Sequence, residues 1–281
     1  MALSSGVKNM LLASFFFSLM QICVKYLPHI PAIEIVFFRS LVSLVISYFF
    51  LKSGKVDPFG SNKKWLILRG LVGAFALILF FLTVQEMPLA SAVTFQFLSP
   101  VFTAILGVYL LKEKVTPKQY IYFALAFFGV ALIKGFDSRV SIGLAILGVV
   151  SAFFSGLAYN IIRKIGSSEH PLVIVLYFPL VTLPITAIIS LFIWVTPTYY
   201  DWLLLLLVGI FTQLAQYFMT LSYQNSKVAG VAIVKYVGIL YALVFGYVLF
   251  DETMPAMSLL GIVLVLSGVV LNVRTKDEAD K

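Results

Sequence analysis

One long segment occurs twice in this sequence, and the repeat limits the folds that the chain can adopt. The second copy covers residues 228–271, and a shift of 139 positions aligns it with the first. The shift places Glu113 on Glu252 and Gly129 on Gly268. Each copy is an apolar stretch, an acidic turn and a second apolar stretch that contains a glycine. Self-similarity at a constant offset predicts two structurally related halves.

The composition places the chain in a membrane. Of its 281 residues 61% are hydrophobic and 11% are charged, and the mean hydropathy is +1.04. A soluble protein of this length would need polar surface that these residues do not provide. The single cysteine excludes an internal disulfide, and the two histidines, His29 and His170, are too far apart in the sequence to predict a metal site. We therefore expect an integral membrane protein with no metal or other cofactor.

Ten apolar stretches have the length of a membrane span. A helix needs ~20 apolar residues to cross the hydrocarbon core, and the connections between the stretches are short and carry turn-forming or charged residues. We therefore predict an all-α integral membrane protein with ten transmembrane helices. The helices are expected at residues 6–26, 31–51, 65–84, 89–111, 117–134, 142–163, 171–195, 201–222, 228–250 and 255–274.

The basic residues predict the orientation of these spans. With a cytoplasmic N-terminus, fourteen Lys and Arg residues lie on the cytoplasmic side, and the other side has only Lys25, Lys134 and Arg139. An excess of Lys and Arg in cytoplasmic loops is the usual topology signal, so we expect both termini to be cytoplasmic. The net charge of +8 then reflects orientation in the bilayer, and we expect no nucleic-acid partner.

The repeat and the number of spans together predict inverted halves. Five spans per half is an odd number, so the second half enters the membrane from the other side. We expect the first repeat at residues 1–136 (helices 1–5), the second at 137–276 (helices 6–10) and a cytoplasmic tail at 277–281. Inverted repeats around a site near the midplane are common in secondary transporters, because exchanging the conformations of the halves changes which side is open.

The repeated segments also resemble a known family. Residues 88–114 read PLASAVTFQFLSPVFTAILGVYLLKEK, and residues 232–252 repeat this pattern with Ile239 in place of the proline. They resemble the EamA branch of the drug/metabolite transporter superfamily, and residues 31–41 (PAIEIVFFRSL) resemble its organic-anion-like solute-carrier subgroup. The resemblance covers essentially the whole chain. It implies a secondary transporter in the cell membrane, which we expect to be a bacterial inner membrane, with substrates ranging from amino acids and nucleotide sugars to phosphorylated sugars and drugs.

Lys235 is the first candidate for a substrate-binding residue. It lies about seven residues into its span, or roughly 10 Å deep at 1.5 Å per residue, which is the limit of what a snorkelling lysine can reach. A charge at this depth usually faces a cavity or a partner. The first repeat has Gln96 at the matching position, where substrate binding and a helix–helix hydrogen bond are equally good explanations.

Two arginines also lie inside predicted spans. Arg39 is near the centre of the second span, five residues after Glu34, a spacing that does not favour a salt bridge within one helix. It is a candidate for substrate binding, and the alternative is a structural arginine that bonds carbonyl groups or another span. Arg69 lies only four residues into the third span. We expect it to snorkel to the cytoplasmic interface.

Two further spans carry polar side chains. Gln213, Gln216 and Tyr217 share one stripe of the eighth span, because they are spaced i, i+3 and i+4, and the sixth span carries Tyr159 and Asn160. A polar stripe in a membrane helix faces either water or another helix. We treat these five residues as candidates for substrate binding, with helix–helix hydrogen bonding as the alternative.

The sequence as a whole favours transport over catalysis. We expect a secondary transporter that moves a small polar metabolite, anionic or carboxylate-bearing, through a central cavity by alternating access. The alternative within transport is an exporter of neutral or zwitterionic amino acids. A membrane-embedded enzyme is a further alternative, but the usual catalytic motifs are missing from the sequence, so we predict no enzyme. The expected partners are the small-molecule substrate and the lipid bilayer, with the chain as a monomer or homodimer.

Overall fold

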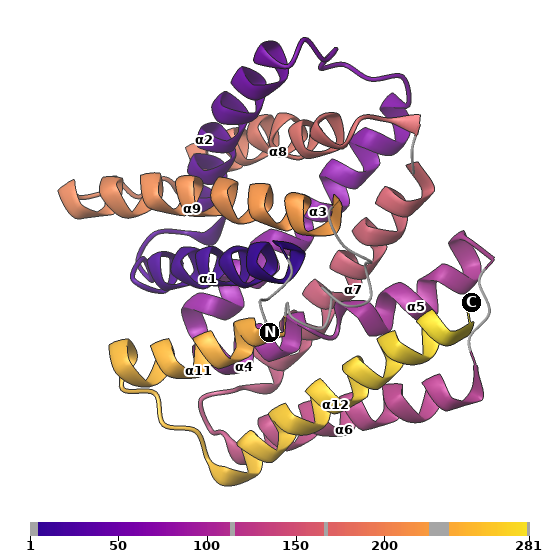
Figure 1. Cartoon of the computed structure of the whole chain (residues 1–281). Helices are drawn as coiled ribbons and strands as arrows, with labels where there is room; N and C mark the ends of the chain where they lie inside the picture. Colours follow the sequence, from indigo (N-terminus) through magenta and orange to yellow (C-terminus); the bar gives the residue numbers. More distant parts are fainter. Residues whose placement is uncertain (1–4, 113–115, 166–167, 225–235, 280–281) are drawn as a thin grey trace.

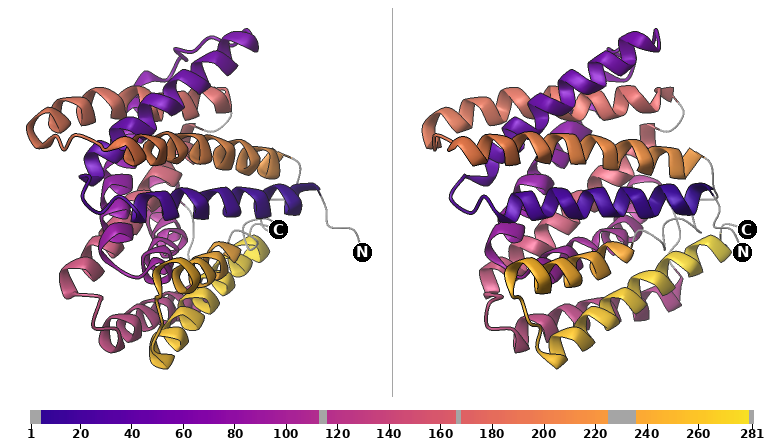
Figure 2. Two further views of the ribbon diagram at one scale, coloured as in Figure 1. Left: turned by 90° about the vertical axis from the view of Figure 1, so that its left-hand side faces the viewer. Right: turned by 60° about the vertical axis from the view of Figure 1, so that its left-hand side comes forward.

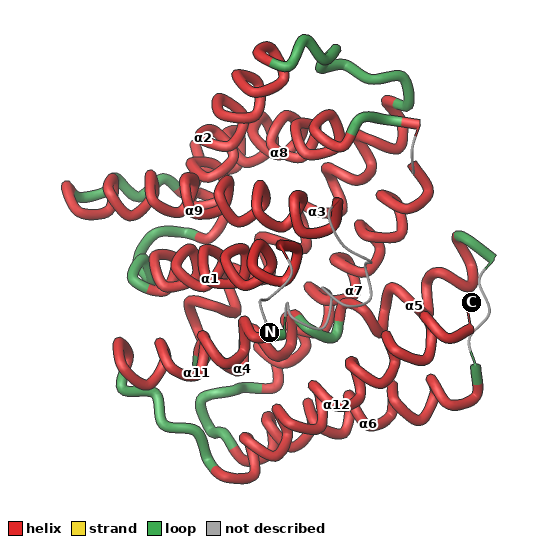
Figure 3. The backbone as a smooth tube through the Cα atoms, viewed as in Figure 1, coloured by secondary structure: helices red, strands yellow, loops and turns green. Residues whose placement is uncertain are grey.

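The described part of the chain is entirely helical. The computed structural model describes residues 5–112, 116–165, 168–224 and 236–279, and within them helices are joined by short loops without any strand (Figures 1 and 3). The helices are α1 (Ser5–Lys25), α2 (Ala32–Ser53), α3 (Lys63–Glu86), α4 (Leu89–Gln96), α5 (Ser99–Leu110), α6 (Pro117–Phe136), α7 (Ile142–Ile165), α8 (Pro171–Ile193), α9 (Tyr199–Gln224), α11 (Val237–Phe250) and α12 (Ala256–Ala279).

These helices confirm the predicted membrane architecture. Eight helical stretches are long and apolar enough to cross a membrane, with α4 and α5 together forming one of them, and α11 and α12 add two shorter apolar stretches. Large apolar side chains such as Phe192 and Val45 are exposed on the outside of the bundle, as expected where lipid is the solvent. The chain is therefore a multi-pass membrane protein with the ten spans that the sequence predicts.

The fourth span differs from the prediction, because it is not one continuous helix. The sequence predicts a helix over residues 89–111, but α4 ends at Gln96 and α5 begins at Ser99. Pro100 explains the break: it has no N–H to donate to the carbonyl of Gln96, and its ring would clash with that carbonyl in a continuous helix. Discontinuous helices at this depth often flank the substrate site of a transporter.

The contacts between helices relate the two halves by an approximate two-fold exchange. The first half, α1 to α6, and the second, α7 to α12, pack so that α1 against α9 is matched by α7 against α3, and α2 against α9 by α8 against α3. Equivalent helices also meet, α2 with α8 and α6 with α12. The chain enters α1 and α7 from opposite ends of the bundle (Figure 2). This confirms the inverted repeats, whereas the exact repeat boundaries stay a prediction.

Two ends of the bundle can be defined from this topology. We call the end where α1 begins and α12 finishes the terminal end, and the other the opposite end (Figure 2). The loops after α1, α3, α6, α8 and α11 all lie at the opposite end, because each of these helices starts from the terminal end. A cytoplasmic location of the terminal end stays a prediction from the basic residues.

Glycines allow the last helices of the two halves to pack closely. A Cβ atom added to Gly129 of α6 would lie 2.5 Å from the carbonyl oxygen of Gly261 of α12, and one added to Gly261 would lie 2.6 Å from the carbonyl oxygen of Gly129. Small residues are typical of close helix contacts in membranes, where backbone approach rather than hydrophobic burial favours association. α6 and α12 therefore form a tight pair at one side of the bundle (Figure 1).

Candidate functional site

A cavity of ≈ 540 Å³ lies between the two halves. Its lining comes from α1 to α5 of the first half and from α7, α8, α9 and α11 of the second. The lining residues of α7, α8 and α9 belong to the parts of these helices nearer the terminal end. The cavity has the volume of a small-molecule site, and its position between inverted halves is where a transporter of this architecture holds its substrate.

Arg39 of α2 is placed in this cavity, as the sequence analysis suggested for a binding residue. Its side chain is 6% exposed, and its Nε donates a hydrogen bond of 3.1 Å to Oγ1 of Thr212 on α9. The guanidinium carbon lies 5.0 Å from the ring centroid of Phe178 on α8. Nη1 has no hydrogen-bond partner among the described residues. Arg39 is thus held by the second half, and its Nη1 keeps unused hydrogen-bonding capacity among the described residues.

Arg69 of α3 also lines the cavity, so the expectation that it snorkels to the interface is wrong. Its guanidinium carbon lies 4.8 Å from the centroid of the same Phe178 ring, and its Nε and Nη1 are buried without a partner among the described residues. Gly73, one turn further along α3, explains the inward position. A Cβ there would lie 3.0 Å from the Phe178 ring, so the glycine admits the ring that Arg69 contacts.

The charges of the two arginines are not balanced by acidic residues in the described lining, which contains no Asp or Glu. The arginines repel each other electrostatically. Glu34, an acidic residue inside the second predicted span, lies in the first turn of α2, at the opposite end of the bundle. Its Oε2 accepts a hydrogen bond of 3.1 Å from the backbone N–H of Val195. The cavity is therefore a region of positive charge.

Gln96 lines the cavity at the break between α4 and α5, but its amide also joins helices. Its Nε2 donates to Oγ of Ser155 at 2.8 Å, and its Oε1 accepts from Oγ of Ser151 at 3.0 Å, both on α7. The hydroxyl of Ser151 lies 2.8 Å from the carbonyl oxygen of Ala76 on α3 as well. These contacts favour the helix-joining role that the sequence left open, with one amide hydrogen of Gln96 remaining for a ligand.

The remaining sequence candidates divide into two groups. Tyr159, Gln213 and Gln216 line the cavity, and Tyr159 interacts electrostatically with Arg69. Asn160 and Tyr217 are not in the lining.

Their surroundings give each of the two excluded residues another role. Asn160 is fully buried, and its Nδ2 donates to the carbonyl of Thr103 on α5 at 2.9 Å, so it joins helices. Tyr217 is 53% exposed and packs beside Phe218 at the lipid-facing surface. The structure therefore gives no support to either residue as a substrate ligand, because neither side chain reaches the cavity.

Lys235, the leading candidate from the sequence, lies outside the described residues, as does Glu113. Its role stays a prediction. The first described residue after it, Tyr236, is buried and packs edge-to-face against Phe97 of the α4–α5 break, with ring centroids 5.0 Å apart. The start of α11 in the second repeat therefore lies against the α4–α5 break of the first repeat.

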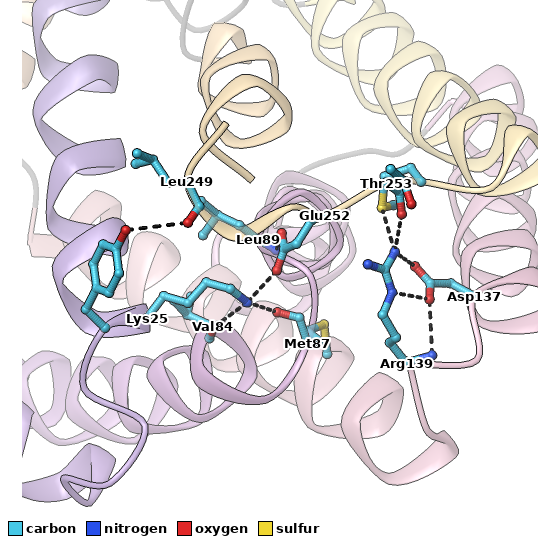
Figure 4. Close-up of polar contacts among 11 residues, drawn as sticks. Lys25, Val84, Met87, Leu89, Asp137, Arg139, Leu249, Glu252 and Thr253 are labelled. Atoms are coloured by element: carbon cyan, nitrogen blue, oxygen red, sulfur yellow. Dashed lines mark hydrogen bonds and ion pairs between the residues drawn. The ribbon is translucent and has the colours of Figure 1, made fainter. Parts of the chain in front are cut away.

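An ion pair joins the two halves at the opposite end of the bundle. Nζ of Lys25, the last residue of α1, lies 2.7 Å from Oε1 of Glu252 in the loop after α11, and it also donates to the carbonyl of Met87 at 2.7 Å. Oε2 of Glu252 accepts from the backbone N–H of Leu89, the first residue of α4, at 2.8 Å (Figure 4). A carboxylate at a helix N-terminus is favourable because it meets unpaired N–H groups and the positive end of the helix dipole.

A second charged contact at this end ties the loop after α6 to the loop after α11. Arg139 binds the carboxylate of Asp137 through Nε and Nη2, each at 2.9 Å, and donates to the carbonyl of Thr253 (Figure 4). The hydrogen bond with Asp137 raises the pKa of Arg139 above its usual range. A third contact at this end joins the loop after α1 to the first turn of α9, where Nε2 of His29 lies 3.0 Å from Oδ2 of Asp201.

Comparison with known proteins assigns this architecture. The sequence matches the EamA-like transporter family over residues 4–135 and again over residues 143–274. It is 31% identical over 277 residues to the pseudopaline exporter CntI of Pseudomonas aeruginosa, covering 98% of each chain. It is 30% identical to solute carrier family 35 member G1 of Homo sapiens, covering 88% of this chain and 73% of that protein.

Solved structures show the same fold. One crystal structure aligns with a TM-score of 0.68 and 14% sequence identity over 96% of each chain. An uncharacterized transporter of Helicobacter pylori is 32% identical over 285 residues, covering 95% of this chain and 94% of that protein. The family match covers both repeats, and the relatives align over nearly the full length of the chain. The chain belongs to the EamA-like transporter family and is a multi-pass membrane transporter of the metabolite type.

Proposed function

We propose that this protein is a secondary transporter for a small organic metabolite that carries negative charge. One observation supports the proposal above the others: Arg39 and Arg69 both line the cavity between the halves, and among the described residues each has guanidinium nitrogen without a hydrogen-bond partner and no acidic partner. Arginine side chains bind carboxylate and phosphate groups through planar, charge-assisted hydrogen bonds. A negatively charged substrate is the natural partner for such nitrogens.

The energetics of a buried charge support the same conclusion. An arginine at the centre of a membrane span costs ~2.5–3.5 kcal/mol on insertion scales, and Arg39 has only a hydroxyl and an aromatic ring as described partners. Water in the cavity reduces this cost while the site is empty. A bound anion offsets it further, so binding energy comes from charges that the folded protein already holds in place.

The alternative substrate, a neutral or zwitterionic amino acid, fits the described lining less well. Its carboxylate could bind an arginine, but its ammonium group would enter a cavity with two cations and no described acidic residue. Only the hydroxyls, amides and aromatic rings of the lining remain to accept it. The family relationship favours transport over the third alternative, membrane-embedded catalysis.

Alternating access between the inverted halves is the mechanism we propose. In this conformation the opposite end is closed by the Lys25–Glu252 pair, and the cavity lies toward the terminal end. Separation of that pair, with closure of the terminal end, would present the cavity to the other side. The basic residues favour a cytoplasmic terminal end, in a bacterial inner membrane, which makes this conformation an inward-facing one.

Reconstitution of the full-length protein tests the proposal. Purified protein in liposomes should exchange radiolabelled small carboxylates across the bilayer, and should do so better than it exchanges labelled neutral amino acids. Arg39→Gln should lower this exchange, whereas Lys52→Gln, a neutralised exposed residue on the same helix and outside the cavity, should not. Preferred exchange of neutral amino acids, unaffected by Arg39→Gln, would reject an anionic substrate.

A further inference from the structure

We propose that the preferred substrate carries two negative charges on one short organic molecule, one for each arginine of the cavity. The proposal rests on the anion-transport function above and defines its substrate class more narrowly. It assigns Arg69 a direct role in substrate binding, and it predicts that the number of charges on a ligand, not only its sign, determines affinity.

The first argument is that each arginine offers a separate binding position. Arg39 has Nη1 without a partner, and Arg69 has Nε and Nη1 without a partner, among the described residues. The two side chains come from different helices, α2 and α3, and neither bonds the other. Because Nε and Nη1 of Arg69 point to different sides of its guanidinium, each can donate its own charge-assisted hydrogen bond to an anionic group.

The second argument is the balance of charge. A ligand with one negative charge would neutralise one guanidinium and leave the other unpaired in a site where the described lining contains no acidic residue. The two cations repel each other. A bound dianion attracts each of them, and these two attractions offset the repulsion. Because electrostatic interactions are stronger in a site partly shielded from water, the second charge of the ligand should contribute substantially to binding.

The third argument is the distance that a ligand must span. Both guanidinium carbons lie within 5.0 Å of the centroid of one ring, that of Phe178. The two guanidinium carbons are therefore no more than about 10 Å apart, so a small ligand can contact both. A short dicarboxylate is such a ligand, with a charged group at each end. A phosphate ester carries the same charge on one group and is the second source of a dianion.

The rest of the lining suits the carbon skeleton of such a ligand. Phe17, Leu77, Phe80 and Val93 supply apolar surface from α1, α3 and α4. Serines are also part of the lining, and the cavity of ≈ 540 Å³ can admit a molecule of this size together with water. An organic dianion therefore finds charged partners at the arginines and apolar contacts beside them.

A series of ligands with equal size and different charge tests the proposal. Succinate, succinamate and succinamide have two, one and no negative charges on nearly the same skeleton. Their dissociation constants are measured on the full-length protein in detergent, from ligand-dependent shifts in its melting temperature, with glycerol phosphate as the phosphate arm. We expect succinate to bind about tenfold or more tighter than succinamate, which is the usual effect of one charge-assisted hydrogen bond, and succinamide to bind least.

Variants then assign the second charge to Arg69. In Arg69→Gln the advantage of succinate over succinamate should fall to less than about twofold, since one cation remains for either ligand. Arg69→Lys should retain part of it, because the charge stays while the planar fork is lost. Lys52→Gln should leave the wild-type order unchanged. Melting curves of the unliganded variants show whether each is folded.

The outcomes separate this proposal from the proposed function. Equal binding of succinate and succinamate to the wild type would overturn the dianion while leaving an anion transporter intact. A preference for succinate that persists in Arg69→Gln would also overturn it. Tighter binding of glycerol phosphate than of succinate would keep the two charges but place them on one group. Failure of all three anions to bind, with succinamide equal to them, would reject the anionic substrate altogether.

Discussion

Basic side chains at the opposite end of the bundle and in the cavity differ in whether they have an acidic partner. At the opposite end the Lys25 ammonium lies 2.7 Å from the Glu252 carboxylate, and both groups are further bonded to backbone atoms of the other elements. In the cavity, Arg39 and Arg69 share an aromatic ring and have no described acidic partner. The charges that join the halves at the opposite end are paired within the protein, whereas the arginines that we propose to bind the substrate have no described acidic partner.

This contrast predicts opposite effects on stability when a charge is removed. The largest effect should come from Glu252→Gln, which leaves the Lys25 ammonium, on a side chain that is only 11% exposed, without its charged partner. Breaking a buried ion pair by removing one member costs about 3 kcal/mol or more. We expect a clear fall in melting temperature. The native thiol of Cys23, two residues before Lys25 and 5% exposed, should react faster with a small neutral maleimide as this end opens.

A double substitution provides the control for that experiment. Replacing both members of the pair, as in Lys25→Met with Glu252→Leu, removes the unpaired charge and should recover much of the lost stability. Glu252→Gln with unchanged melting temperature and unchanged Cys23 labelling would show that the ion pair does not hold the opposite end closed.

The second prediction concerns the cavity. Arg69→Gln should weaken binding of an anionic substrate by about ten- to hundred-fold, the worth of ~1.5–3 kcal/mol from one charge-assisted contact. Its melting temperature without ligand should stay the same or rise, because the substitution removes a charge that has no described partner. Calorimetric binding and a melting curve measure the two effects. A large fall in melting temperature would mean that Arg69 stabilises the fold, as Glu252 is expected to, and would contradict the difference predicted between the two sites.

The third prediction concerns the ring that both arginines contact. Phe178→Leu keeps an apolar side chain but removes the aromatic face, and a cation–π contact is worth about 0.5–1 kcal/mol at a partly solvated site. We expect the variant to bind anions several-fold more weakly, since it lacks the ring that holds both arginines in place. Titration calorimetry on the variant measures this loss. An unchanged affinity would show that Thr212 and the surrounding helices position the cations without Phe178.

The smallest effect should come from Arg139→Gln. The side chain of Arg139 is 39% exposed, and ion pairs of partly exposed groups contribute about 1 kcal/mol or less. We expect a small decrease in melting temperature with little change in Cys23 labelling. Destabilisation as large as that of Glu252→Gln would identify the Asp137–Arg139–Thr253 contact as an equal part of the closure.

Much of the fold could be predicted from the sequence, because span length and the repeat are properties of the chain alone. Most described helix ends fell within a few residues of the predicted ones, and the constant offset with five spans per half predicted inverted halves. The break before Pro100 was missed, although proline provided the signal: it deprives the Gln96 carbonyl of its helical donor. Arg39, chosen as a candidate for its depth in the span, lines the cavity, and its role in substrate binding stays a prediction.

The orientation of side chains around each helix could not be predicted in the same way. In a soluble protein an apolar stripe identifies the buried face, but here both lipid and protein interior are apolar, so the pattern around the helix is nearly uniform. Tyr159 and Asn160 are adjacent and equally polar, yet one lines the cavity and the other bonds α5. Arg69 lies near a helix end, where sequence favours snorkelling, yet it turns inward to Phe178.

The sequence by itself therefore determined the ten spans, the inverted halves and the excess of basic residues at one end, since these depend on length, offset and count. The tertiary structure alone decided which polar side chains meet. Helices α2, α3 and α8 bring Arg39, Arg69 and Phe178 together, and helices α1, α4 and α11 bring Lys25 to Glu252. These contacts join residues far apart in the chain, and only the packing of backbones against one another fixes which of them are neighbours.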